Sequence, residues 1–179
     1  MSVVVHGRGA LAEHLRVSVM SDTNAAVVVV GVDGSMGVAP VAHMTDEVID
    51  SVYEQPMQEL ITALQRSFND GCRRIVVVTP TSGMSGANHH ALHAALAESA
   101  RILVKSAARQ WGTDGVTVNA VAVDPSRFGI DPKVSGPVAN APRALVGEVD
   151  PAGVVNWLCS EAAHDVTGQT VVCDGGLLM

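Results

Sequence analysis

The sequence is poor in aromatic residues and contains no long apolar run, no cluster of positive charge and few cysteines. Its 179 residues include two Trp, two Phe and a single tyrosine, Tyr53, so aromatic residues make up only 3% of the chain. Hydrophobic residues nevertheless make up 47%, and the core must therefore consist of Val, Ala, Leu, Ile and Met. A chain of this length can bury one substantial core, and we expect a single domain over residues 1–179.

Each absence excludes a class of protein. No apolar run reaches the roughly 18 residues that a membrane-spanning helix needs. The net charge of −7 comes without a Lys/Arg cluster, which argues against a surface for nucleic acid or anionic membranes. Cys72, Cys159 and Cys173 show no paired spacing, and the N-terminus shows no secretion signal. We therefore expect reduced thiols and a cytoplasmic protein.

Short β-branched runs alternate with helical stretches along the chain. The expected strands cover residues 3–5, 27–30, 75–79, 116–123 and 171–173. The expected helices cover 10–17, 45–69, 87–111 and 151–160, and Pro56 must kink or interrupt the second of these. The Pro- and Gly-rich segment 124–149 is expected to be a loop. The pattern predicts an α/β fold with a doubly wound parallel sheet of about five strands.

The helix at 87–111 carries an apolar stripe whose members are spaced by three and four residues. We expect this stripe to face the core, and its members are Leu92, Ala95, Leu96, Ser99, Ile102, Leu103 and Ala107.

Three stretches resemble the short-chain dehydrogenase/reductase family. Residues 107–125, AARQWGTDGVTVNAVAVDP, resemble its helix-to-strand passage. Residues 147–179, GEVDPAGVVNWLCSEAAHDVTGQTVVCDGGLLM, contain its Asp-Pro helix start, Thr-Gly-Gln and final Asp-Gly-Gly in order. Residues 27–47, VVVVGVDGSMGVAPVAHMTDE, occupy the position of its Asn-Asn-Ala-Gly strand. The resemblance implies a Rossmann-like fold, in a truncated and degenerate member of the family.

The resemblance also implies a proton relay that this sequence does not carry in its usual form. The family uses a Tyr and, four residues later, a Lys that lowers the pKa of the phenol. Counting back from Lys105, the Tyr position holds His93 and the Lys position holds Ala97, so the Tyr-x-x-x-Lys motif is missing. The catalytic Ser of the family falls near Thr81 or Ser82. Ser82 and His93 are therefore the candidate catalytic residues. His93 is either a substitute acid or a polar residue without a catalytic role in an open cleft.

The cofactor half is shortened as well. His6-Gly7-Arg8-Gly9 fits the start of G-x-G-x-x-A, and Gly7 and Gly9 are the candidate residues for binding NAD(P) at a helix start. Only about 22 residues separate Val5 from Val27, where a complete binding half of the family has roughly 60 more. Asp33 could hold a ribose only if residues 27–30 formed the second strand of that half. We therefore expect a tight turn at these glycines and no bound cofactor, with NAD(P) as the only cofactor to consider.

His89, His90 and His93 suggest a metal site, because His89 and His93 are four residues apart and would share one helix face. No carboxylate or cysteine lies at a matching spacing, so we expect no metal.

The family builds its subunit interfaces from the segments that this sequence retains. These are helices 87–111 and 151–160 and the C-terminal strand, and the resemblance implies that they form a homo-oligomer or a hetero-oligomer with a paralogue of the family. The favoured hypothesis is a catalytically silent subunit that pairs with an active NAD(P)-dependent dehydrogenase or with itself. Two alternatives remain open: an active oxidoreductase with an altered relay, and a small-molecule-binding module without turnover. Whether the chain is an enzyme is thus not decided by its sequence.

Overall fold

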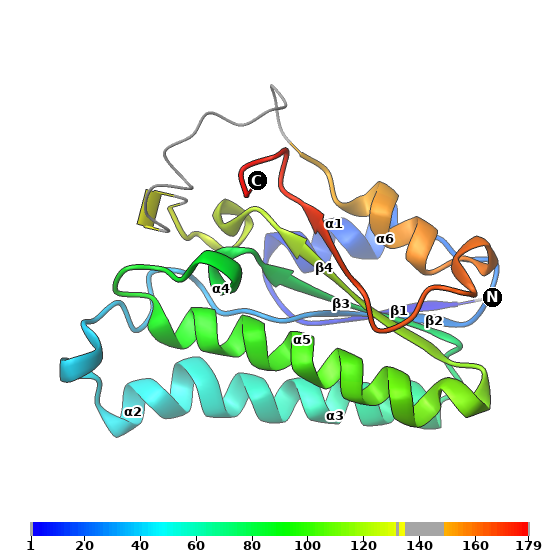
Figure 1. The fold of residues 1–179 in the computed structure, drawn as a ribbon, viewed down its shortest axis with the longest axis horizontal. Coiled ribbons are helices and arrows are strands. Elements are labelled where there is room, and N and C mark those ends of the chain that lie inside the picture. The colour runs from blue at the N-terminus through cyan, green and yellow to red at the C-terminus, as the bar shows by residue number, and fades with distance from the viewer. Residues whose placement is uncertain (1, 132, 135–148, 179) are drawn as a thin grey trace.

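Five parallel strands form one sheet (Figure 1). The computed structural model describes residues 2–131, 133–134 and 149–178, and its strands lie side by side in the order β1-β2-β3-β4-β5. Their bounds are Val3–His6, Ala25–Val29, Arg74–Pro80, Thr117–Val123 and Thr170–Cys173. Every neighbouring pair is parallel. The predicted fold class, a doubly wound parallel α/β sheet with about five strands, is confirmed.

Helices cover both faces of the sheet. Helices α1 (Ala10–Ser18) and α6 (Ala152–Leu158) pack on one face, and α3 (Gln55–Asn69) and α5 (Ala91–Trp111) pack on the other. Because β2 is buried on both sides, its residues are aliphatic without alternation. Val27 packs on the α1 side and Val28 packs on the α3 side. None of the described helices has the length and hydropathy needed to cross a membrane.

The connection between β1 and β2 is short, and it differs from the next connection in the handedness of its crossover. Residues 7–24 contain α1 and no further strand. The chain moves to the next strand in the same direction at each step, yet α1 and α6 lie on the opposite face from α3 and α5. Two of the four crossovers must therefore be left-handed, whereas about 98% of such crossovers are right-handed. As a result, the connections after β1 and β2 leave the sheet on opposite faces.

The helix expected at 45–69 is continuous but changes its hydrogen-bonding pattern before Pro56. It consists of α2 (Asp46–Ile49), the π-helical turn η2 (Asp50–Glu54) and α3. Proline cannot donate a backbone hydrogen bond, and its ring clashes with the carbonyl one turn earlier in an α-helix. In the wider turn, the Gln55 amide donates to the Asp50 carbonyl, which accommodates the proline without ending the helix.

The long helix expected at 87–111 begins later than predicted. A short helix, α4 (Ser82–Ser85), follows β3, and α5 starts only at Ala91. The predicted apolar stripe is partly wrong, because Ala95 is exposed and Ile102 is 60% exposed, whereas Leu96 and Ala107 are buried and Leu103 packs against the core. The buried face of α5 is rotated toward the sheet and α4, and it consists of His93, Leu96, Ala97, Ala100, Val104, Ala107 and Ala108.

The remaining described elements are short 3-10 turns: η1 (Val41–His43), η3 (Gly112–Asp114), η4 (Pro125–Phe128) and η6 (Glu161–Ala163). Of the loop predicted at 124–149, residues 135–148 lie outside the described residues. Its first part is not irregular, since Asp124 caps η4 by accepting a hydrogen bond from the Ser126 amide at 2.8 Å.

β1 is an edge strand, and one side chain covers part of its open edge. The Arg16 guanidinium lies 2.7 Å from the Gly7 carbonyl oxygen and 3.4 Å from the Val5 carbonyl oxygen. Arg16 also forms an ion pair with Glu13. A charged side chain on an exposed edge hinders pairing with another chain, so Arg16 both satisfies carbonyl groups and protects the edge.

We predict that Arg16→Ala lowers the free energy of unfolding by about 1 kcal/mol, because the Gly7 carbonyl loses its charged donor. It should also increase concentration-dependent association through the uncovered edge. Urea unfolding and light scattering measure the two effects. Arg8→Ala is the matched control, because Arg8 is 90% exposed and pairs only with the exposed Glu59; an equal effect of both substitutions would contradict the prediction.

Candidate active site

The two candidate catalytic residues lie on neighbouring helices at the carboxyl end of β3. Ser82 is the first residue of α4 and is fully buried, and His93 lies in the first turn of α5 and is 3% exposed. The prediction that His93 lies in an open cleft is wrong. The helix α4 folds back over the start of α5 and covers this position, an arrangement that no local pattern in the sequence indicates.

His93 is held as a neutral imidazole. Its Nε2 lies 3.4 Å from the carbonyl oxygen of Asp33, so this nitrogen carries the proton and donates it. Burial lowers the pKa of His93 below its ordinary value, and the nearby His90 acts in the same direction. A neutral imidazole has only one N–H, and the carbonyl already uses it. Nδ1 can accept a proton but cannot donate one, so His93 is poorly suited to replace a tyrosine acid.

Ala97, at the Lys position of the relay, is a packing residue. Ala97 is 1% exposed. A Cβ placed on Gly83 of α4 would lie 3.1 Å from the Ala97 Cβ and 2.5 Å from Glu98 Oε1. The two helices thus approach each other as closely as a glycine and an alanine allow. Because Ala97 is buried in this contact, a lysine at position 97 would have to displace its neighbours.

Four buried polar atoms in this region have no hydrogen-bond partner among the described residues. They are Thr79 Oγ1, Ser82 Oγ, His93 Nδ1 and Glu98 Oε1, the last of which lies beside Gly83. Buried polar groups are normally satisfied, and such exceptions often mark functional sites. The sequence analysis missed Thr79, although a hydroxyl at the end of the aliphatic run Val76–Val78 is the signal that could have found it.

The candidate cofactor residues form a tight turn between β1 and α1. Gly7 has φ 114° and Gly9 has φ 89°, which are backbone conformations that residues other than glycine rarely adopt. A Cβ on Gly7 would lie 2.7 Å from the Val29 carbonyl oxygen. Gly7 therefore permits close contact between this turn and the end of β2. Gly9 is the N-cap of α1 and offers no side-chain cap.

The positions of His89 and His90 differ from the arrangement on one helix face that the sequence suggested. His89 precedes α5 and has φ 60°, so His89 and His93 do not share a helix face. His90 is buried, and its two ring nitrogens lie 2.9 Å from the Asn88 carbonyl oxygen and 3.1 Å from the Gly34 carbonyl oxygen. His90 and His93 thus hold the turn at residues 33–34. No group of three potential metal ligands occurs within residues 2–131, 133–134 and 149–178.

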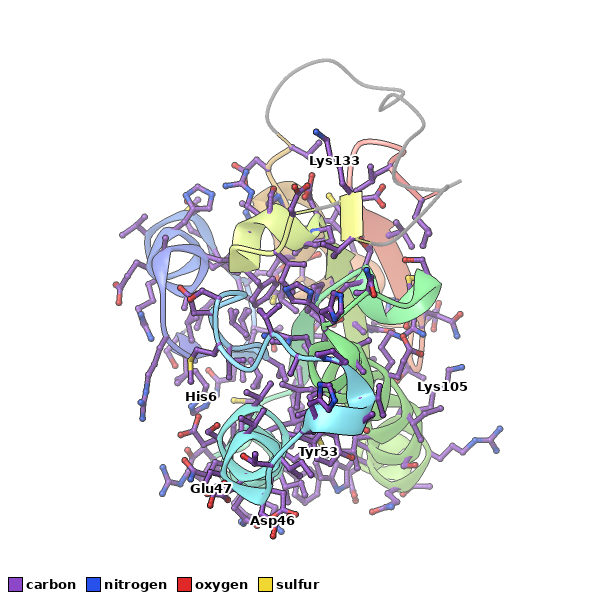
Figure 2. All side chains as sticks on the ribbon, turned by 90° about the vertical axis from the view of Figure 1, so that its left-hand side faces the viewer. His6, Asp46, Glu47, Tyr53, Lys105 and Lys133 are labelled. Carbon is purple, nitrogen blue, oxygen red and sulfur yellow. The ribbon has the colours of Figure 1, made fainter. Side chains whose placement is uncertain are left out.

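Neither Tyr53 nor Asp33 restores the missing chemistry. The Tyr53 hydroxyl lies 3.1 Å from Ser99 Oγ, where η2 meets α5, and Figure 2 shows Tyr53 low in the helical layer. The phenol therefore belongs to the packing of η2 against α5. The Asp33 carboxylate accepts hydrogen bonds from the Ser35 hydroxyl and amide, which lower its pKa. It closes a local turn.

We predict that Ala97→Lys, which restores the Lys of the relay, lowers the free energy of unfolding by about 3 kcal/mol. The new side chain would overpack the α4–α5 contact and bury a charge without a partner. Ala95→Lys is the control, since Ala95 lies on the exposed face of the same helix. Urea unfolding of both variants tests this; equal stability of the two would show that α4 does not restrict position 97.

Comparisons with known proteins agree with the fold and with the shortened chain. The profile of the family described as enoyl-(acyl carrier protein) reductase matches residues 9–178. A tropinone reductase homologue of Arabidopsis thaliana is 29% identical over 114 residues, 60% of this chain and 43% of that protein. The 3-oxoacyl-(acyl-carrier-protein) reductase FabG of Salmonella typhimurium is 32% identical over 114 residues, 60% of this chain and 47% of that protein.

Among solved structures, levodione reductase superimposes with a TM-score of 0.65 at 20% identity, covering 86% of this chain and 66% of that one. This likeness concerns the fold. The matched parts span less than half of the two curated relatives above. Because the family profile covers nearly the whole sequence, and the five-stranded sheet fits it, the chain belongs to the short-chain dehydrogenase/reductase family.

Proposed function

We propose that this chain is a catalytically silent member of its family, which pairs with an active NAD(P)-dependent dehydrogenase or with itself. One observation carries the proposal: the Lys position of the proton relay is filled by the buried Ala97, which packs so closely against α4 that a Cβ added to Gly83 would lie 3.1 Å from the Ala97 Cβ. A substitution that merely lacked a lysine would leave room for another cation. Here the neighbouring helix occupies the space, so the relay position now serves helix packing.

The acid side of the reaction is equally poorly supplied. Reduction of a carbonyl needs a proton delivered to the oxygen as hydride reaches the carbon. The proton of His93 is donated to the Asp33 carbonyl, and burial keeps the ring neutral. Tyr53 is engaged with Ser99 between η2 and α5. These contacts support a site that has kept the fold of a reductase without its proton donor.

The cofactor side supports the same conclusion. In open α/β sheets, ligands bind at the carboxyl ends of the strands, where adjacent connections diverge to opposite faces. The turn at Gly7 lies against the end of β2, and residues 7–24 provide none of the further strands of a complete binding half. We propose that NAD(P) is not bound.

A second candidate function has one observation in its favour. Thr79 on β3, Ser82 on α4 and His93 on α5 each have a buried polar atom without a hydrogen-bond partner among the described residues. An oxidoreductase that uses His93 Nδ1 as a base and Ser82 as a hydrogen-bond donor would make use of them. Hydride transfer that is abolished in His93→Ala would establish this function in place of the first.

The surface proposed for pairing is apolar on both helical layers. Ile102 on α5 is 60% exposed, Trp157 on α6 is 43% exposed and Val172 on β5 is 38% exposed. Helices α5 and α6 lie on opposite faces of the sheet, so the proposed contacts involve both faces, and a partner subunit would bury the exposed apolar side chains on each. We also propose a cytoplasmic location, because Cys72, Cys159 and Cys173 are all free thiols.

We predict that Ile102→Glu and Trp157→Glu each weaken association at least tenfold, because burying a carboxylate in an apolar contact is unfavourable. The association measured is that of the chain with itself, or with a co-expressed intact dehydrogenase of the family, by sedimentation. Val17→Glu is the control, since Val17 is 83% exposed on α1, outside the proposed surface. Loss of association in the control alone, or a chain that binds neither itself nor the dehydrogenase, would refute the proposed pairing.

A further inference from the structure

The ring of Phe128 lies directly on the backbone of Gly31. A Cβ placed on Gly31 would be 2.5 Å from both Cδ1 and Cε1 of Phe128. Gly31 follows β2, whereas Phe128 ends η4, which follows β4. The side chain thus reaches past the carboxyl end of β3, which lies between the two strands, to contact the end of β2.

The backbone next to this ring also contacts the loop that follows β2. The Gly34 amide donates to the Phe128 carbonyl oxygen at 2.7 Å. A Cβ on Gly34 would lie 2.6 Å from the Gly129 carbonyl carbon and 2.6 Å from Ile130 Cγ1. Ile130 is 1% exposed and anchors the segment. The ring is therefore held in place by its own backbone and not only by apolar packing.

The ring occupies the region where this fold would bind a ligand. The connection after β1 leads to α1 on one face, and the connection after β2 leads to α3 on the other. The divergence of two adjacent connections creates a crevice at the carboxyl ends of their strands. Phe128 packs against the core on the α1 side, and η4 packs against α1. The Phe128 ring lies beside this crevice, against Gly31 in the connection that leaves β2.

We propose that Phe128 is a built-in plug, which takes the place of a planar ring ligand of the size of nicotinamide at the divergence of β1 and β2. The inference rests on the proposed function, since it gives a reason why the chain would not bind NAD(P), but it can fail independently. The absence of a side chain at Gly31 makes room for the ring, and we call this space the slot. Removing the Phe128 ring vacates the slot while β2 and η4 remain joined through the Gly34 amide.

The test compares wild-type protein with Phe128→Ala, Phe128→Val and Phe128→Leu. The probes are reduced nicotinamide mononucleotide, which carries the ring, and ribose 5-phosphate, which does not. Binding is measured by titration calorimetry, and folding of each variant by circular dichroism and thermal unfolding. Phe128→Val retains more packing than Phe128→Ala and provides a second open variant if the alanine protein unfolds. Phe128→Leu keeps the slot filled and is the matched control.

The plug predicts that the Ala or Val variant binds the mononucleotide at least tenfold more tightly than wild type. It predicts no gain for ribose 5-phosphate and none for Phe128→Leu. A folded open variant whose affinity is unchanged would overturn the plug and leave the silent-subunit proposal intact. Equal gains for both probes would also overturn it, because the ring would then not be the group recognised. Tight binding by the wild-type protein would instead contradict the proposed function.

Discussion

The short connection between β1 and β2 is the constraint on which the rest of this structure depends. Helix α1, the only helix described between the two strands, lies on the opposite face of the sheet from α3, so the crossover from β1 to β2 has the opposite hand from that through α3. β1 then becomes an edge strand, partly covered by Arg16. The turn at Gly7 is brought against Val29, and the ring of Phe128 lies against Gly31, two residues further along the chain from Val29. The tight turn is thus part of the short connection itself.

The second feature of the molecule is the close approach of α4 and α5. A glycine and an alanine meet where a reductase of this family would place its lysine. His93 is buried on the same helix, and its imidazole donates a hydrogen bond to the Asp33 carbonyl and so fastens the turn at residues 33–34. Positions that would serve chemistry therefore serve packing. The fold is retained because its aliphatic strands and helices are independent of those few positions.

The five strands could be predicted because their sequences are rich in β-branched aliphatic residues. The inner strands, such as Ala25–Val29, are buried on both faces, whereas the outer strands β1 and β5 are only partly buried. An irregularity in the helix at Pro56 could also be predicted, because proline has no backbone N–H to donate. Its π-helical form could not be predicted. The start of α5 and its buried face could not be predicted, because α4 covers His93 and Ala97 only in the folded chain. The absence of a Tyr-x-x-x-Lys motif was evident in the sequence, whereas the lack of room for its lysine depends on Gly83, from a different helix.

The central claim is that this chain has kept the fold of a dehydrogenase but lost the binding of its cofactor. The most direct measurement is a calorimetric titration of the purified wild-type chain with NADH and with NADPH, at ligand concentrations up to about 1 mM. A dissociation constant of about 1 mM corresponds to a binding free energy of only about 4 kcal/mol. The account predicts no saturable heat with either nucleotide. A dissociation constant in the micromolar range for either one would contradict it, and Gly7, Gly9 and His93 would then be parts of a working site.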